Sequence, residues 1–201
     1  QALELGDQIW SDHRLISLIC DNYGIYTVPS SIGDLVNLQV LGLSGNNLSS
    51  LPTTIENLVN LTQIDLDNNN FSNLSSQFSG LVQLSSLNIG YNNFLTIPEQ
   101  VFDMDSLDFF NIESNYILSL PDSLSNLSDL DSINVTANVL YCFAGEQDSV
   151  PSWLDDLNFP VIGLEDQDCS NAGCTDPDMM NYDPDVIIDD GSCTTCWEAI
   201  G

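Results

Sequence analysis

Residues 38–60, with the sequence LQVLGLSGNNLSSLPTTIENLVN, decide the fold of this chain, because the same spacing of apolar residues recurs before and after them. Leucine opens each copy of the segment at a constant interval of 23 residues. The opening residues are Leu15, Leu38, Leu61, Leu84, Leu107 and Leu130. Within a copy, the apolar positions are the first, fourth, sixth, eleventh, fourteenth, eighteenth and twenty-first. The chain is therefore an array of internal repeats, which we number from one to six.

The pattern LxxLxLxxNxLxxLPxxIxxLxx resembles the short form of the leucine-rich repeat, and the match runs from Leu15 to Leu140. The resemblance implies an α/β-type solenoid: a right-handed arc with a parallel sheet on its concave side and mostly irregular or 3₁₀ structure on its convex side. The residues agree with this, because alternating Leu41 and Leu43 suit a strand with one buried face, and stacked repeats close a core that one repeat lacks. We expect strands at residues 17–21, 40–44, 63–67, 86–90, 109–113 and 132–136.

Two further positions of the repeat carry a structural signal. The ninth is asparagine in five repeats, as Asn46, Asn69, Asn92, Asn115 and Asn138. A short amide there can satisfy backbone groups where the chain leaves the strand, which predicts a column of buried, structural asparagines. The fifteenth position is Pro29, Pro52, Pro98 or Pro121 in four repeats and presets an extended backbone. Tyr23 departs from the first pattern and Ser75 from the second.

The repeats divide the chain into four segments: residues 1–14, 15–140, 141–172 and 173–201. The first is expected to be an N-terminal cap whose apolar side chains cover the open end of the core, namely Leu3, Leu5, Ile9 and Trp10. The third resembles the C-terminal cap of leucine-rich repeat proteins, which implies a short helix at about residues 152–157 and a disulfide, for which we favour Cys142 with Cys169. Cys20 stands at an inward position and is expected to be a buried thiol acting as a small apolar group.

The last segment contains GCTDPDMMNYDPDVIIDDGSC at residues 173–193. It is similar to an element, GCTDPxxxNYxPxxxxDDGSC, of exported proteins from Bacteroidetes-type and other, often marine, microbes. The resemblance implies export and a Cys174–Cys193 disulfide, and leaves the pairing of Cys196 open. Its carboxylates could bind calcium, which prefers oxygen ligands, through a subset of Asp176, Asp178, Asp183, Asp185, Asp189 and Asp190. The spacing does not follow the EF-hand loop, so the alternative is an acidic, disulfide-stapled spacer.

The charge balance restricts the partners and the surroundings of the protein. Thirty acidic residues face a single basic one, Arg14, for a formal net charge of −29. Repulsion excludes nucleic acid and disfavours anionic membranes. Because salt screens such self-repulsion, a saline or calcium-containing medium is favoured. Together with the six cysteines, which indicate an oxidising compartment, this predicts a secreted or cell-surface protein.

The residues that face outward from the strands supply the candidate site. The predicted ligand-binding residues of the concave face are Asp65, Asp67, Asn88, Tyr91, Phe109, Asn111, Glu113 and Asn134. Aligned amides and carboxylates offer hydrogen bonds to a polar ligand, and the two aromatic rings offer stacking. The alternative is that these side chains are polar because the face is wet, and that their amides bond to one another along the sheet.

The sequence indicates binding rather than catalysis. One histidine and no lysine leave few groups for a catalytic centre, and the open sheet around acids such as Asp65 and Asp108 gives little burial to tune an acid–base pair. We therefore expect a non-catalytic module that binds another protein on its concave face. The alternative is a carbohydrate-binding or adhesion module that recognises extracellular polysaccharide. The sequence does not predict the oligomeric state.

Overall fold

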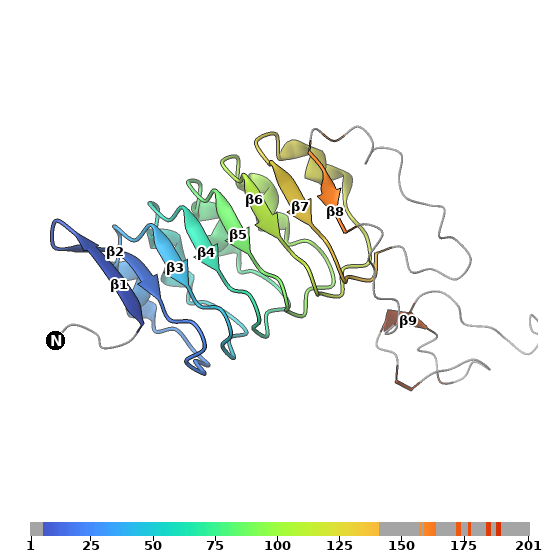
Figure 1. Cartoon of the computed structure of the whole chain (residues 1–201), viewed down its shortest axis with the longest axis horizontal. Coiled ribbons are helices and arrows are strands. Elements are labelled where there is room, and N and C mark those ends of the chain that lie inside the picture. Colours follow the sequence, from blue (N-terminus) through green and yellow to red (C-terminus); the bar gives the residue numbers. More distant parts are fainter. Residues whose placement is uncertain are drawn as a thin grey trace, which may run out of the picture.

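The computed structural model describes residues 6–140, 157, 159–163, 172–173, 177, 184–185 and 188–189. In this part of the chain one eight-stranded sheet contains the strands in sequence order, and a separate pair of strands is parallel (Figure 1). The large sheet contains β1 (Asp7–Ser11), β2 (Arg14–Ile19), β3 (Val40–Gly42), β4 (Gln63–Asp65), β5 (Ser86–Asn88), β6 (Phe109–Asn111), β7 (Ser132–Asn134) and β8 (Val161–Ile162). The pair consists of β9 (Ala172–Gly173) and β10 (Ile188–Asp189).

Strands β2 to β7 are parallel, and each pairs with the next at the register of the repeat. Leu41 lies opposite Ile64, and Ile64 opposite Leu87. The six predicted strands and their register are confirmed, although β3 to β7 each cover only the first three of the five predicted residues. Backbone hydrogen bonds continue beyond them, as from Leu43 N to Asp65 O at 2.8 Å. Strand β2 instead begins earlier than predicted, because its first residues pair with β1.

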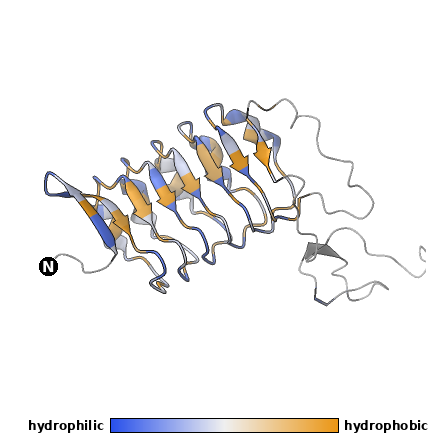
Figure 2. Ribbon diagram, in the orientation of Figure 1, coloured by the Kyte–Doolittle hydropathy of each residue, from blue (hydrophilic) through white to orange (hydrophobic). Residues whose placement is uncertain are grey.

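The core fills the space between the sheet and the convex side. The inward residues of the central strands are buried, namely Leu41, Leu43, Ile64, Leu66, Leu87, Ile89, Phe110 and Ile112. Apolar residues recur along the whole stack of strands and turns (Figure 2). Each repeat therefore packs against its neighbours, and the hydrophobic core is continuous from Leu15 to Leu140.

Five short 3₁₀ helices form the convex side of the described repeats, in agreement with the irregular or 3₁₀ structure expected there. They are η1 (Ser30–Asp34), η2 (Thr53–Asn57), η3 (Ser76–Gly80), η4 (Glu99–Asp103) and η5 (Asp122–Asn126). Each follows a residue with φ between −59° and −80°, which is Pro29, Pro52, Ser75, Pro98 or Pro121. Proline is fixed near this angle, so it presets the entry into each helix.

The N-terminal end differs from the expected cap. Strand β1 pairs antiparallel with β2 and so extends the sheet sideways. Ile9 and Trp10 are 57% and 53% exposed, so the expectation that they cover the core is wrong. Leu3 and Leu5 lie outside the described residues. The predicted burial of Cys20 is confirmed, and burial, followed by the negative charge of Asp21, raises the pKa of its thiol.

At the other end, β8 adds a parallel strand to β7, and the buried ring of Phe159 packs with the core. Leu157, the last residue of the predicted cap helix, also packs against the core. The other residues of that helix lie outside the described part of the chain. Cys142, Cys169, Cys174, Cys193 and Cys196 lie outside it too, so both predicted disulfides stay predictions.

The ninth-position asparagines join neighbouring repeats where the strands end. Asn92 Oδ1 accepts a hydrogen bond from Phe71 N at 2.8 Å, and its Nδ2 donates to Leu66 O, Ile89 O and Gly90 O at 3.0, 3.2 and 2.8 Å. The other four asparagines of the column bond in the same way, and all five are buried. The residue before each asparagine has left-handed backbone, with φ of +48° for Tyr91. The predicted structural role of the column is confirmed.

Replacing Asn92 by alanine should lower the free energy of unfolding by about 1–3 kcal/mol, because the buried N–H of Phe71 would lose its acceptor. The carbonyl groups of Leu66 and Ile89 would each lose one of two amide donors and keep those of Asn69 and Asn115. Chemical denaturation measures the change. Asn93→Ala is the matched control, because Asn93 is the next residue and is exposed. Equal stabilities of the two variants would contradict the role assigned to the column.

Replacing Ser75 by proline should stabilise the protein by about 0.4–1 kcal/mol. Ser75 has φ of −70° and ψ of 155°, which proline adopts without strain, and Pro52 has almost the same backbone one repeat earlier. The Ser75 hydroxyl is also buried without a hydrogen-bond partner among the described residues. Thermal and denaturant unfolding measure the gain. Ser79→Pro, in the interior of η3 where proline removes a helical N–H donor, serves as the control and should destabilise the protein. An unfolding midpoint of Ser75→Pro at or below that of the parent would contradict this account.

Candidate functional site

The fifth position of the repeat lies in the middle of the concave face and shapes the end of each strand. Backbone hydrogen bonds between repeats use the N–H groups of positions six and eight, as in Leu43 and Gly45. The N–H of position seven does not take part in them. The side chain at position five accepts the N–H of position seven instead. The pairs are Asp65 Oδ1 with Asp67 N, Asn88 Oδ1 with Gly90 N, Asn111 Oδ1 with Glu113 N, and Asn134 Oδ1 with Thr136 N, at 3.0 to 3.2 Å. Part of the predicted ligand-binding set thus has a local structural task.

The second repeat shows that this bond matters. Its fifth residue is Gly42, which has no side chain to accept the N–H of Ser44. Asp21 of the preceding repeat supplies the acceptor, with 2.9 Å between Ser44 N and Asp21 Oδ1. Added atoms on Gly42 would approach Asp21 Oδ1 to 3.1 Å, so the glycine also leaves room for that carboxylate.

Side chains of neighbouring repeats form a second set of bonds across the face. Asn111 Nδ2 donates to Asn88 Oδ1 at 3.0 Å and to Glu113 Oε1 at 3.3 Å. Asn134 Nδ2 donates to Glu113 Oε2 at 3.0 Å. The carboxylate of Glu113 is therefore held from two sides by amides. The sequence analysis gave hydrogen bonds among the amide side chains along the sheet as the alternative to ligand binding, and these hydrogen bonds are present.

The carboxylates of Asp65 and Asp67 lie beside this network without a compensating cation nearby among the described residues. Burial raises the pKa of Asp65, and the charge of Asp21 raises it further, against hydrogen bonds from Asp67 N and Asn88. Burial also raises the pKa of Asp67, as do the charges of Asp65 and Glu113. The centre of the concave face thus concentrates negative charge and hydrogen-bond acceptors.

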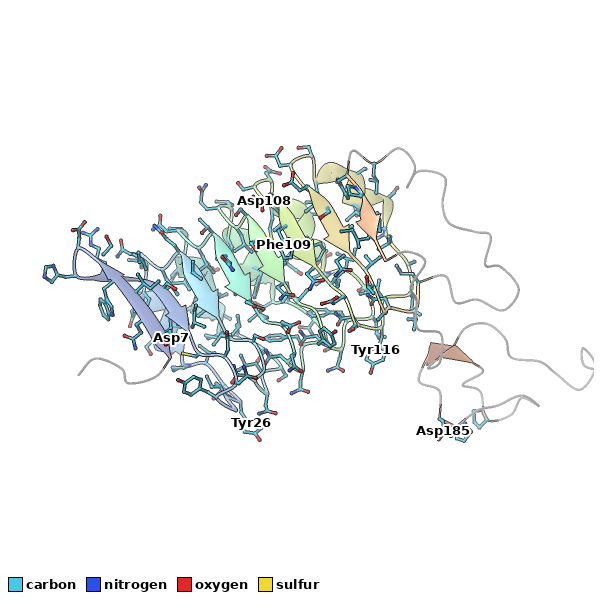
Figure 3. All side chains as sticks on the ribbon, in the orientation of Figure 1. Asp7, Tyr26, Asp108, Phe109, Tyr116 and Asp185 are labelled. Atoms are coloured by element: carbon cyan, nitrogen blue, oxygen red, sulfur yellow. The ribbon has the colours of Figure 1, made fainter. Side chains whose placement is uncertain are left out.

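The structure joins six of the eight predicted residues and separates the two aromatic ones. Phe109 pairs with Ser86 at the start of strands β5 and β6, whereas Tyr91 follows the end of β5. Five residue steps separate Ser86 from Tyr91, which corresponds to at most about 16 Å of extended chain. Phe109 and Tyr91 are 46% and 52% exposed. They therefore do not make one stacking surface, and Figure 3 shows Phe109 at the same strand end as Asp108.

Three polar residues of the face were not in the predicted set. Asp21 accepts the Ser44 N–H, the Ser44 hydroxyl lies 3.5 Å from Asp67 Oδ2, and the Thr136 hydroxyl donates to Asn134 Oδ1 at 2.7 Å. All three stand at the seventh position of their repeats. Their shared position in the repeat is the sequence signal that could have identified them as residues of the concave face.

The predicted calcium-binding residues lie almost entirely outside the described part of the chain. Asp185 is described and exposed, and Asp189 is described by its backbone in β10. Asp176, Asp178, Asp183 and Asp190 lie outside. Within the described residues, no group of three or more histidine, cysteine, aspartate or glutamate side chains is placed to hold a metal ion. Calcium binding by the tail stays a prediction.

A family model described as a leucine-rich repeat region matches residues 14–153, which is more than half of the chain. The chain belongs to the leucine-rich repeat family. No curated protein matches it in sequence. Within the described residues of this leucine-rich repeat protein, no helix has the length and apolar content to cross a membrane.

Solved structures of other leucine-rich repeat proteins are similar to it. A leucine-rich repeat protein of Leptospira interrogans is 25% identical with a TM-score of 0.59, over 76% of this chain and 43% of that one. An internalin from Listeria monocytogenes is 29% identical with a TM-score of 0.56, over 63% and 36%. The plant peptide hormone receptor RGFR1, in complex with RGF2, is 26% identical with a TM-score of 0.55, over 62% and 21%. This chain spans less than half the length of each.

Replacing Asp65 by asparagine should stabilise the protein at neutral pH. Asparagine already makes the position-five bond at Asn88 and Asn111, so the turn should be kept while a buried charge is removed. Because the folded-state pKa of Asp65 is raised, its proton stabilises the folded state fully at pH below the unfolded pKa, and this contribution is lost as pH rises through the folded pKa. The gain in melting temperature should therefore shrink on acidification. Asp122→Asn on the convex side is the control; a lower melting temperature of Asp65→Asn at neutral pH would contradict this assignment.

Proposed function

We propose that this leucine-rich repeat protein is a non-catalytic interaction module that binds a positively charged segment of another protein on its concave face. The observation that carries the proposal is the imbalance of hydrogen-bonding groups there. The amides of Asn111 and Asn134 donate within the network, while the carboxylates of Asp65, Asp67 and Glu113 have no cationic partner among the described residues. The face thus offers acceptors and negative charge to a ligand.

A partner that complements this face brings donors and positive charge. Lysine and arginine side chains supply both, and their bonds to carboxylates are stronger than neutral ones. A cation beside Asp65 and Asp67 would also favour their charged forms, and so offset the burial and the repulsion that raise the pKa of both groups. The chain has one arginine and no lysine of its own, so it cannot supply these groups itself.

The relatives support a protein partner. Leucine-rich repeats generally serve as a non-enzymatic protein-interaction fold with an extended binding surface. The receptor RGFR1 was solved in complex with RGF2. We extend to this chain the mode of binding that such complexes represent, and we place it outside the cell, as its charge and the resemblance of its tail predict.

A carbohydrate ligand is the second candidate, and Phe109 favours it. Its ring is nearly half exposed at one end of the concave face, where it could stack on a sugar ring, and hydroxyl groups could donate to the carboxylates. The two candidates differ in charge. A neutral polysaccharide should bind with little dependence on salt, whereas a cationic peptide should release as salt is raised.

The test compares two variants of equal net charge against arrays of lysine- and arginine-containing peptides and of extracellular polysaccharides. The first carries Asp65→Asn, Asp67→Asn and Glu113→Gln on the concave face. The control carries Glu99→Gln, Asp103→Asn and Asp122→Asn on the convex side. The first should lose affinity for cationic peptides by at least about tenfold, and the control should keep it.

Three results would decide against the cationic partner. Equal loss in both variants would mean that only net charge matters. Binding of neutral glycans that is lost on Phe109→Ala would favour the carbohydrate candidate. Binding that survives in the first variant would place the site elsewhere on the protein.

A further inference from the structure

One edge of the solenoid carries no charge. It consists of the residues that follow the strands, from the eighth to the fifteenth position of the first five repeats, and we call it the neutral edge. Its residues are 22–29, 45–52, 68–75, 91–98 and 114–121, and none of them is charged. The chain has thirty acidic residues. Carboxylates stand on both sides of this edge, as Asp67 does on the concave face and Glu99 on the convex side, but not within it.

Three exposed asparagines form a row along the neutral edge. Asn47, Asn70 and Asn93 occupy the tenth position of successive repeats. The backbone holds them in register, since each N–H donates to a carbonyl of the preceding repeat, as from Asn70 N to Leu48 O at 2.7 Å. Neighbouring asparagines are therefore about one strand spacing, ~4.8 Å, apart. Within the described part of the chain no hydrogen bond uses their side-chain amides, so these donors and acceptors are open to a ligand.

Tyrosine rings accompany the amides. All four tyrosines of the described residues belong to the neutral edge, namely Tyr23, Tyr26, Tyr91 and Tyr116. The first three are 53%, 72% and 52% exposed. Figure 3 shows Tyr26 and Tyr116, from the first and fifth repeats, along the same edge of the sheet. A tyrosine ring offers an apolar face for stacking and a hydroxyl for hydrogen bonding.

We propose that the neutral edge binds a neutral polysaccharide that runs across the repeats. Such a ligand presents hydroxyl groups and the faces of sugar rings. The amides of the asparagine row donate and accept hydrogen bonds, as hydroxyl groups require, and the tyrosines stack on the rings. A ligand of repeated units meets the same amide at each step, because one sugar unit of an extended chain covers a length close to the strand spacing.

The distribution of charge selects this ligand. The net charge of −29 repels anionic polysaccharides and acidic proteins. A cationic ligand gains more on the concave face, where Asp65 and Asp67 lie. Protein interfaces commonly have an apolar centre, whereas Leu95 is the only exposed leucine, isoleucine, valine or phenylalanine of the neutral edge. An uncharged, hydroxyl-rich polymer fits both the chemistry of the edge and its repetition.

The neutral edge is separate from the surface of the proposed function and does not depend on it. The acids proposed to hold a cationic segment are at the fifth and seventh positions of the concave face. Phe109, which favours the carbohydrate candidate on that face, begins β6, whereas the neutral edge follows the strands. Variants at the two surfaces therefore distinguish the two proposals.

Titration calorimetry of the full chain with cellohexaose, laminarihexaose, mannohexaose and maltohexaose tests the site. At least one of these neutral hexasaccharides should bind, with little dependence on salt. A variant with Asn47→Ala, Asn70→Ala and Asn93→Ala should lose affinity for it by at least about tenfold. The matched control carries Asn57→Ala, Gln83→Ala and Asn126→Ala, which remove three exposed amides outside the neutral edge, and it should bind as the parent does. Both variants keep the net charge of the parent.

A second variant tests the rings. Tyr26→Ser and Tyr116→Asn place at each position a residue that neighbouring repeats already carry, as Ser49 and Asn93 do, so the fold should be kept while stacking is lost. This variant should also bind the hexasaccharide more weakly. Phe109→Ala, and the variant with Asp65→Asn, Asp67→Asn and Glu113→Gln, should bind it as the parent does. Melting curves verify that all variants are folded.

Four results would each overturn the proposal. They are no binding of any of the four hexasaccharides, equal affinity of the asparagine variant and its control, unchanged affinity on removal of the two rings, and loss of binding in Phe109→Ala.

Discussion

The structure depends on how each repeat satisfies its buried backbone groups where the chain leaves the sheet. At this point parallel pairing ends inside the core, and unpaired N–H and C=O groups would be costly. The asparagine at the ninth position resolves this by accepting from the preceding repeat and donating to carbonyls of both repeats, as Asn69 does with Leu48, Leu43 and Leu66. One side chain thereby fixes the turn and the stacking of two repeats.

This constraint also shapes the exposed face. The turn into the asparagine requires left-handed backbone at position eight, which Gly45 and Asn68 adopt readily and Tyr91 adopts at a cost. The strand therefore ends early, and the N–H of position seven needs an acceptor on the exposed side. Position five provides it, which explains why aspartate and asparagine recur there. The position-five side chains can therefore bind a ligand only through oxygen atoms that these hydrogen bonds do not use.

Charged residues distinguish one part of the repeated fold from another. Described carboxylates lie on the concave face, as Asp65 and Asp67 do, and on the convex side, as Glu99 and Asp122 do, while the single arginine, Arg14, begins β2. Burial, with repulsion from neighbouring carboxylates, raises the pKa of both Asp65 and Asp67, so this face favours a partner that brings positive charge.

The sequence by itself determined the periodic part of this protein: the six strands, their register, the inward leucines, the asparagine column and the 3₁₀ helices after Pro29 and its equivalents. Each repeats one local pattern, so a single alignment predicts all copies. The tertiary structure alone decided that Ile9 and Trp10 are exposed, that Phe109 and Tyr91 lie at opposite strand ends, and that Asp21 replaces the missing side chain of Gly42. These features depend on how a terminal strand joins the sheet and where side chains of adjacent repeats meet. Packing in three dimensions decides these contacts between repeats, and the spacing of residues along the chain does not predict them.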